Sequence, residues 1–177
     1  MRSLTLGSIL AAILMFVLGF IFFGLLGAQM FTPLAPETAT AVQGALAQHL
    51  PATGTYMVPA DEAGWMAGPS AVVDYVAAGG APAMPAAMAM GFVHFLLSAL
   101  LIAYGLAAVG GDFGRQARAV IWFGLAAAAF MHLGDPIWYG FGWRKTLFLF
   151  VADGAIFIAG GLVLARWFTS GRPAATA

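Results

Sequence analysis

The sequence contains no cysteine and very few charged residues. Of its 177 residues, seven are Lys or Arg and seven are Asp or Glu, which together make up 8% of the chain. The absence of cysteine excludes disulfides, thiolate chemistry and cysteine-ligated metal centres. The formal net charge is zero and the basic residues are scattered, so the sequence indicates no nucleic-acid-binding surface.

Standard enzyme signatures are also missing. The chain has no G-x-S-x-G elbow, no H-E-x-x-H motif, no phosphate-binding glycine loop and no dinucleotide fingerprint. It has no internal repeat, so a transporter built from inverted halves gains no support. Membrane active sites can be assembled from scattered residues, but nothing in this sequence gives a positive reason to expect an enzyme or favours a cofactor.

Hydrophobic residues make up 62% of the chain and gather in four long runs. A helix rises about 1.5 Å per residue, so about 20 apolar residues cross the hydrocarbon core of a bilayer. The first run follows Arg2, but it is longer than a signal-peptide core and no small-x-small cleavage site follows it, so we expect a span there too. The prediction is an all-α, four-transmembrane-helix bundle with spans at about 5–28, 86–109, 119–133 and 146–165.

The basic residues indicate an orientation, because positive charge near span ends stays in the cytoplasm. With a cytoplasmic N-terminus, five of the seven basic residues lie inside, namely Arg2, Arg115, Arg118, Arg166 and Arg172. The other two, Arg144 and Lys145, then lie outside. We therefore expect a multi-pass protein of the bacterial inner membrane with both termini in the cytoplasm.

The segment 29–85, between the first two runs, contains no Lys or Arg but four acidic residues. Such a segment is easily translocated, so we expect it to form a small extracytoplasmic cap, within a single membrane domain 1–177. Pro36 fits the first turn of a helix, and apolar residues recur at helical spacing up to His49. The cap should therefore begin with a helix from about Pro36 to His49.

The rest of the cap has the composition of a β-hairpin. Beta-branched and aromatic residues at 54–58 and 71–76 predict two strands, and Gly64, Gly68 and Pro69 mark a loop between them. We expect the hairpin to lie over the outer mouth of the bundle.

Aromatic residues lie near the expected span ends. Trp122 and Trp167 are close to the inner ends, while Trp138, Tyr139 and Trp143 belong to the short outer turn. Amphipathic rings anchor helices at the headgroup level, so these five side chains should form interfacial belts.

Small residues in the spans predict close helix packing, since apolar helices gain little hydrophobic drive toward one another in lipid. The glycines concerned are Gly24, Gly27, Gly124, Gly154, Gly160 and Gly161. These glycine faces could also support self-association.

Four ionisable residues fall within or beside the outer halves of the spans, namely His94, His132, Asp135 and Asp153. Counted from the outer span ends, His94 and Asp153 lie at a similar depth of roughly 12 Å, and His132 lies nearer the surface. A carboxylate at mid-membrane costs about 2.5–3.5 kcal/mol. Asp153 should therefore be protonated, paired or exposed to a water-filled cavity.

Three interpretations of this polar cluster follow. In the first, His94 and Asp153 hydrogen-bond to each other or to neighbouring helices and fix the packing. In the second, the cluster lines a pocket under the cap that binds a small ligand, a lipid group or protons. In the third, His94 and His132 ligate haem, or hold a divalent ion together with Asp153 or Asp135. The unequal depths of the two histidines count against haem. Asp135 and Arg144 flank the outer turn, where a clasp between them is expected.

Several short stretches carry a resemblance to other proteins. His132-Leu133, the aromatic turn Trp138-Tyr139-Gly140-Phe141 and Asp153 in the next span resemble a family of uncharacterised bacterial four-helix integral membrane proteins. The stretch Gly54-Thr55-Tyr56-Met57-Val58-Pro59 is similar to a Gly-x-Tyr-x-x-Pro strand in that family. The resemblance implies a four-helix layout, and the family has no assigned activity.

Together these features favour a non-enzymatic accessory, scaffold or partner-binding membrane protein. The bilayer is its first partner, and a protein partner or a second copy could contact the cap or the glycine faces. The cap carries tyrosine, tryptophan and methionine but no cation, which suits protein contact. The alternative is a protein that handles a small ligand, protons, metal or haem through His94, His132 and Asp153.

Overall fold

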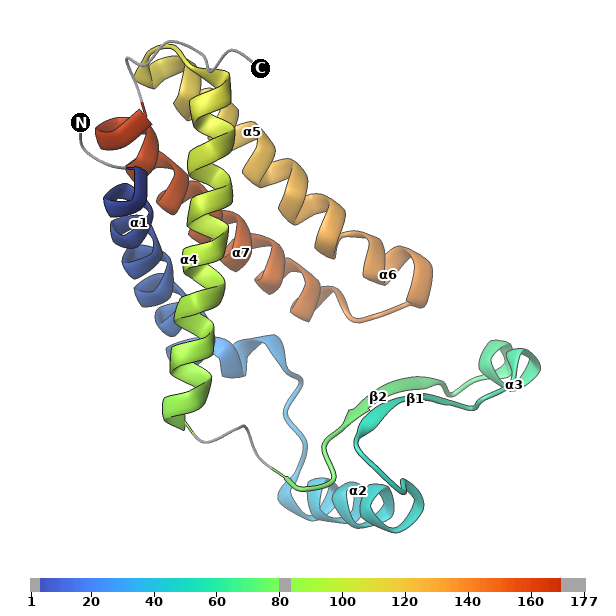
Figure 1. Cartoon of the computed structure of the whole chain (residues 1–177). Coiled ribbons are helices and arrows are strands. Elements are labelled where there is room, and N and C mark those ends of the chain that lie inside the picture. The colour runs from blue at the N-terminus through green and yellow to red at the C-terminus, as the bar shows by residue number, and fades with distance from the viewer. Residues whose placement is uncertain (1–3, 80–83, 170–177) are drawn as a thin grey trace. The chain divides into compact units, whose positions relative to one another are not determined.

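The structure is a computed structural model of the chain, and it describes residues 4–79 and 84–169. Helices account for 77% of the described residues, and these residues also form one two-stranded sheet. The chain divides into two compact units. Unit one consists of Met1–Thr32 and Pro85–Ala177, and unit two of Pro33–Met84 (Figure 1).

Unit one contains the long apolar helices. Among the described residues, four helical stretches are long and apolar enough to cross a membrane, which supports a multi-pass membrane protein. They are α1 (Leu4–Gly19) with its π-helical continuation η1 (Phe20–Leu25), α4 (Met84–Val109), α5 (Phe113–His132) with the short α6 (Gly134–Tyr139), and α7 (Trp143–Leu164) with the π-helical η3 (Ala165–Thr169). A short 3₁₀ turn, η2 (Gly27–Met30), follows η1.

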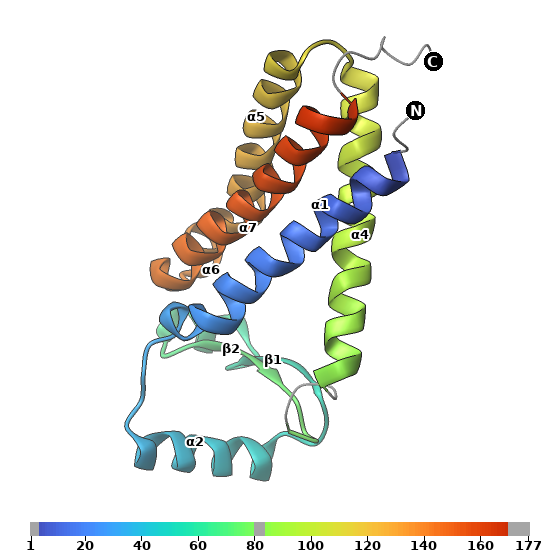
Figure 2. The same cartoon turned by 90° about the vertical axis from the view of Figure 1, so that its left-hand side faces the viewer.

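The four stretches run up and down through unit one. The start of α1, the connection 110–112 between α4 and α5, and the end of α7 lie together at one end, which we call the α4–α5 end (Figure 2). The start of α7, α6 and the start of α4 lie toward the opposite end, which we call the α6 end.

Helix α7 packs against both α1 and α5, and glycines permit the close approach. A Cβ added to Gly161 would lie 2.6 Å from Val120 Cγ1, and one added to Gly124 would lie 2.7 Å from Ile158 Cγ1. Gly160 meets Met15 at 2.6 Å in the same way. These three glycines lie in helix contacts as predicted, whereas Gly24 is exposed and meets only Phe20 of its own helix.

The third span was predicted at about 119–133, and the helical stretch in the structure extends further at both ends. Helix α5 begins six residues earlier, where the Asp112 carboxylate accepts the Arg115 backbone N–H at 2.8 Å and caps the helix. After a break at Leu133 the chain continues as α6 to Tyr139. Pro136 explains the break, because it has no N–H to donate to the carbonyl of His132 four residues earlier.

Unit two contains a helix and the β-hairpin. Helix α2 spans Pro36–His49 as predicted, with Pro36 in its first turn. Strands β1 (Gly54–Val58) and β2 (Ala71–Tyr75) pair antiparallel, with Tyr56 opposite Val73, and Thr55 Oγ1 donates to Asp74 Oδ1 at 2.8 Å across the strands.

The connection between the strands differs from the predicted loop. It contains helix α3 (Glu62–Ala67), whose N-terminus is capped by the Asp61 carboxylate accepting the Gly64 N–H at 2.8 Å. Gly64, which predicted a loop, therefore donates the N–H of this cap. The helix ends at Ala67, and Gly68 follows it with a positive φ of 62°.

Candidate functional site

Two of the four predicted polar residues form a pair inside unit one. His132 Nε2 lies 2.7 Å from Asp153 Oδ2, within hydrogen-bonding distance. The His132 side chain is 11% exposed and the Asp153 side chain 38% exposed, so the carboxylate forms the more open side of the pair. We refer to these two residues as the His–Asp pair.

The helix packing explains why these residues meet. His132 is the last residue of α5, and Asp153 lies about 15 Å from the start of α7 by the helical rise. Because the chain continues beyond His132 as α6, the end of α5 is not the end of the helical stretch, and His132 lies deeper than the sequence suggested. Ala128 lies one helical turn before His132, and its Cβ is 3.5 Å from the position that a Cβ would take at Gly154, the residue after Asp153. This contact of small residues keeps the two helices close.

His94 does not join this pair. Like Asp153, it lies about 15 Å from the start of its helix by the helical rise, but its side chain is exposed on α4. Its ring stands 5.1 Å from the neighbouring Phe95 ring, and no hydrogen bond links it to Asp153. Of the two alternatives in the first interpretation, a bond between His94 and Asp153 is therefore not formed. Asp153 instead bonds to a neighbouring helix, through His132 of α5.

Asp135 and Arg144 do not form the expected clasp. Arg144 Nε donates instead to the backbone carbonyl of Gln29 at 2.6 Å, which ties the start of α7 to η2. Asp135 is half-buried in α6 and makes no hydrogen bond or ion pair with any residue that the structure describes.

The metal and haem interpretation gains no ligand set from this arrangement. In the described part of the chain, no three His, Cys, Asp or Glu side chains gather closely enough to hold a metal ion. His94 is exposed on α4, whereas His132 is buried and bonds to Asp153 of α7.

A second polar cluster, which the sequence analysis missed, lies at the α4–α5 end. Gln116 is fully buried, and its amide nitrogen donates to the carbonyls of Thr169 at 3.2 Å and Leu106 at 3.3 Å. The Thr169 hydroxyl bonds to the amide oxygen of Gln116 and also reaches the Leu164 carbonyl at 3.1 Å. This amide cluster, Gln116 with Thr169, joins the end of α4, the start of α5 and η3.

A regular spacing could have revealed both polar positions on α5. The buried residues of this helix recur every four positions, namely Gln116, Val120, Gly124, Ala128 and His132. Such a stripe marks one helix face, so Gln116 and His132 could have been placed toward the neighbouring helices together.

The expected interfacial aromatics all point away from the core. The side chains of Trp122, Trp138, Tyr139, Trp143 and Trp167 are each more than half exposed. Their exposure suits an anchoring role at headgroup level, which stays a prediction.

Comparison with known proteins leaves the chain without an assigned relative. No protein-family model matches it, and neither curated proteins nor solved structures show a match. The resemblance to uncharacterised bacterial four-helix membrane proteins therefore stays a prediction based on short motifs.

Proposed function

We propose that this protein is a non-enzymatic, partner-binding subunit of the bacterial inner membrane. In this proposal both termini are cytoplasmic, and the cap, residues 29–85, meets a partner protein on the periplasmic side. The observation that carries the proposal is that unit two has no core of its own. None of its described residues from 33 to 79 is buried.

Apolar side chains are exposed on each element of unit two. Met66 is 80% exposed, and Met57 and Val72, which face each other across the hairpin, are 50% and 39% exposed. A two-stranded hairpin needs a covered apolar face for stability in water. Exposed methionine and valine with no nearby Lys or Arg suit a protein surface rather than a phosphate-bearing partner.

The membrane part supports the same function through His94. Ionisable residues within spans almost always face a bundle interior or pair with another polar group. His94 has neither within the described residues, and α4 is the least covered span, with 17% of its apolar stretch buried against 33% in α1 and α7. In the proposal, a membrane helix of the partner or of a second copy packs on this face and bonds to His94.

In-cell photo-crosslinking tests this function. A photoreactive residue replaces Met57 in the hairpin or Leu97 on the exposed face of α4, with Phe130 on α5 as the control position, since it is apolar and 89% exposed. We expect one discrete protein adduct from the first two positions and none from Phe130. In His94→Leu, the Leu97 adduct should fall about threefold, as expected for one interhelical polar contact of about 0.6 kcal/mol. Equal adducts at all three positions, or none, would contradict the proposal.

A second candidate function rests on the His–Asp pair. An imidazole and a carboxylate at 2.7 Å can share and pass on a proton, and the half-exposed Asp153 leaves one side of the pair open. Proton flux into liposomes containing the protein should then be lost in both Asp153→Asn and His132→Gln, and retained in Asp135→Asn. Absence of flux with the unaltered protein would remove this candidate. If the unaltered protein contained a bound metal or showed a haem spectrum, and His94→Ala lost that signal, the result would instead support the metal and haem interpretation.

A further inference from the structure

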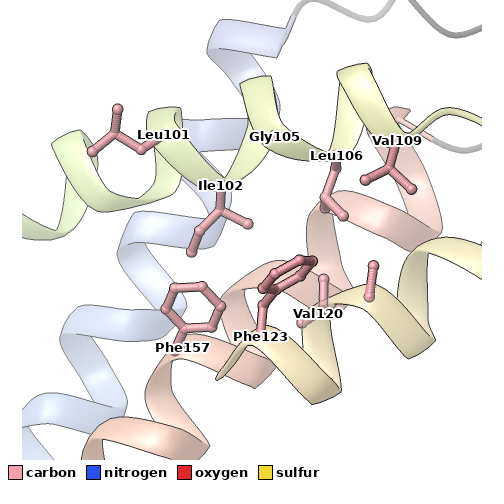
Figure 3. A pocket seen from close by; sticks show the side chains of 9 residues that line it. Leu101, Ile102, Gly105, Leu106, Val109, Val120, Phe123 and Phe157 are labelled. Carbon is pink, nitrogen blue, oxygen red and sulfur yellow. The ribbon is translucent and has the colours of Figure 1, made fainter. Parts of the chain in front are cut away.

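An apolar groove opens between α4 and α5 toward the α4–α5 end of unit one (Figure 3). Its volume is about 420 Å³, and it is lined by five residues of α4 from Leu101 to Val109, three of α5 from Ala119 to Phe123, and Phe157 of α7. None of the nine carries a polar side chain. Pockets that hold small molecules measure about 300–1,000 Å³, so this groove can take an apolar ligand of that class.

The shape of the groove suits a single hydrocarbon chain. Ile102 and Leu106 point from α4 toward Phe123 and Phe157 and form its floor (Figure 3). From Leu101 to Val109 it runs about 12 Å along the helix, which is most of one leaflet of about 15 Å. A second helix, about 10 Å across, would not fit a space of this volume bounded by three helices.

The rim of the groove is open to the bilayer. Leu101 and Phe123 are 65% and 69% exposed, so a chain can enter sideways from the lipid. At the α4–α5 end, the connection 110–112 directly follows the lining residue Val109. The amide cluster holds the end of α4 against α5 and η3 there.

Two arginines, Arg115 and Arg118, lie in the first two turns of α5, between this connection and the lining residues of α5. The Arg115 side chain folds back over Gly111, where a Cβ would lie 2.9 Å from its Cδ, and Arg118 directly precedes Ala119 of the lining. Neither guanidinium forms an ion pair with a described carboxylate. Asp112 is occupied as the cap of α5. The apolar groove thus ends beside two unpaired positive charges.

We propose that the α4–α5 groove binds one acyl chain of an anionic phospholipid, whose phosphate lies at Arg115 and Arg118. The apolar lining takes the chain, and the two arginines select a negative headgroup over a zwitterionic one. This inference does not depend on the partner-binding function.

Native mass spectrometry of the full chain in mild detergent tests the proposal. The probes are phosphatidylglycerol and phosphatidylcholine with the same acyl chains. We expect about tenfold stronger retention of phosphatidylglycerol, as juxtamembrane arginines favour anionic lipids. Arg118→Gln should reduce this preference, and Lys145→Gln, which removes an exposed cation at the α6 end, should not.

A groove-filling variant tests the chain site separately. A Cβ at Gly105 would meet no atom within 4 Å, so Gly105→Leu can fill the groove without a backbone clash. This variant should bind neither lipid. The control Gly44→Leu changes a helical glycine of α2 whose surroundings are equally open, and it should still bind both lipids. In the unaltered protein, a phosphatidylglycerol with a photoreactive acyl chain should label α4 at 101–109 and α5 at 119–123, a result that needs no variant to fold.

Four outcomes would overturn the inference. Two concern retention: equal retention of the two lipids, and unchanged lipid retention in Gly105→Leu. The third is that glycerol phosphate displaces bound phosphatidylglycerol as effectively as free phosphatidylglycerol does. The fourth is that the photoreactive lipid labels residues all along the exposed face of α4. A fifth outcome, a dimer that becomes a monomer in Gly105→Leu, would also overturn the inference, because it would assign the groove to a second copy.

Discussion

At the scale of single residues, unit one contains few polar side chains, and the buried Ser8, Gln116, His132 and Thr169 are hydrogen-bonded. His132 bonds to Asp153, and Gln116 bonds to Thr169 and to two backbone carbonyls. No buried side-chain nitrogen or oxygen in the described part of the chain lacks a partner. Pairing is what a hydrocarbon environment demands, because an unsatisfied polar group there finds no water.

The His–Asp pair gives the first prediction. His132→Phe leaves the Asp153 carboxylate without a partner and should lower the free energy of unfolding by up to about 1.7 kcal/mol, the upper range for interhelical polar contacts. Asp153→Asn keeps a group that can bond to the imidazole and should cost less, about 0.6 kcal/mol. Thermal unfolding in detergent measures both. Asp135→Asn serves as the control and should have no effect, since Asp135 makes no bond to a described residue; a loss equal to that of His132→Phe would contradict the assignment.

The amide cluster gives the second prediction. Gln116→Leu removes the donor to the Thr169 carbonyl and leaves that buried group unpaired, which should cost about 1–3 kcal/mol. The double variant, which adds Thr169→Val, should lose less free energy of unfolding than the sum of the two single variants, because both side chains belong to one hydrogen-bond network. Chemical unfolding of the two single variants and the double variant measures this coupling. Gln43→Leu, on the exposed face of α2, should be neutral; strict additivity would mean that the two side chains do not act together.

At the scale of elements, composition and spacing predicted most of the structure. Helix α2 has the predicted bounds, and the strands differ from prediction only at the last residue of β2. Helix α3 could not be anticipated from glycines alone, because its start depends on Asp61 accepting the Gly64 N–H. The start of α5 was missed because the continuous apolar run begins only at Ala119, after Arg115, Gln116 and Arg118. Long arginine stems can lie along a helix, and Gln116 satisfies its amide internally.

The glycine contacts of α7 give an element-scale prediction. A methyl group at Gly161 would collide with the stiff, branched Val120, whereas at Gly160 it would meet the flexible thioether of Met15. Gly161→Ala should therefore lower stability by about 1–3 kcal/mol, and Gly160→Ala by less. Gly105→Ala, with no atom nearby, should be neutral or stabilising. Thermal unfolding of the three variants gives the ranking, and equal losses at 160 and 161 would show that the close contact with Val120 is not rigid.

The polar site illustrates what the sequence could not supply. Counting residues inward from span ends gave similar depths for His94 and Asp153, and each lies ten residues from the start of its helix in the structure. Depth does not fix which face of a helix a residue occupies, and Asp153 faces α5 rather than α4. The four-residue stripe on α5 carried that information, because it includes His132 but has no counterpart at His94.

At the scale of the whole molecule, the account rests on how the chain is threaded through a membrane. The four apolar stretches run up and down in unit one, so the connection 110–112 and the segment before α4 belong to opposite ends of α4 (Figures 1 and 2). The cap without Lys or Arg is proposed to lie outside, and the arginines at the start of α5 inside.

The absence of native cysteine makes this claim directly measurable by labelling single introduced cysteines with a membrane-impermeant maleimide. Ser70→Cys lies in the exposed connection before β2, and Gly114→Cys lies in the exposed first turn of α5, where its Cβ meets only an ordinary contact at 3.5 Å. The account predicts that Ser70→Cys is labelled in intact cells and Gly114→Cys only after permeabilisation. The reverse pattern would invert the orientation, and labelling of both in intact cells would contradict the passage of α4 across the membrane.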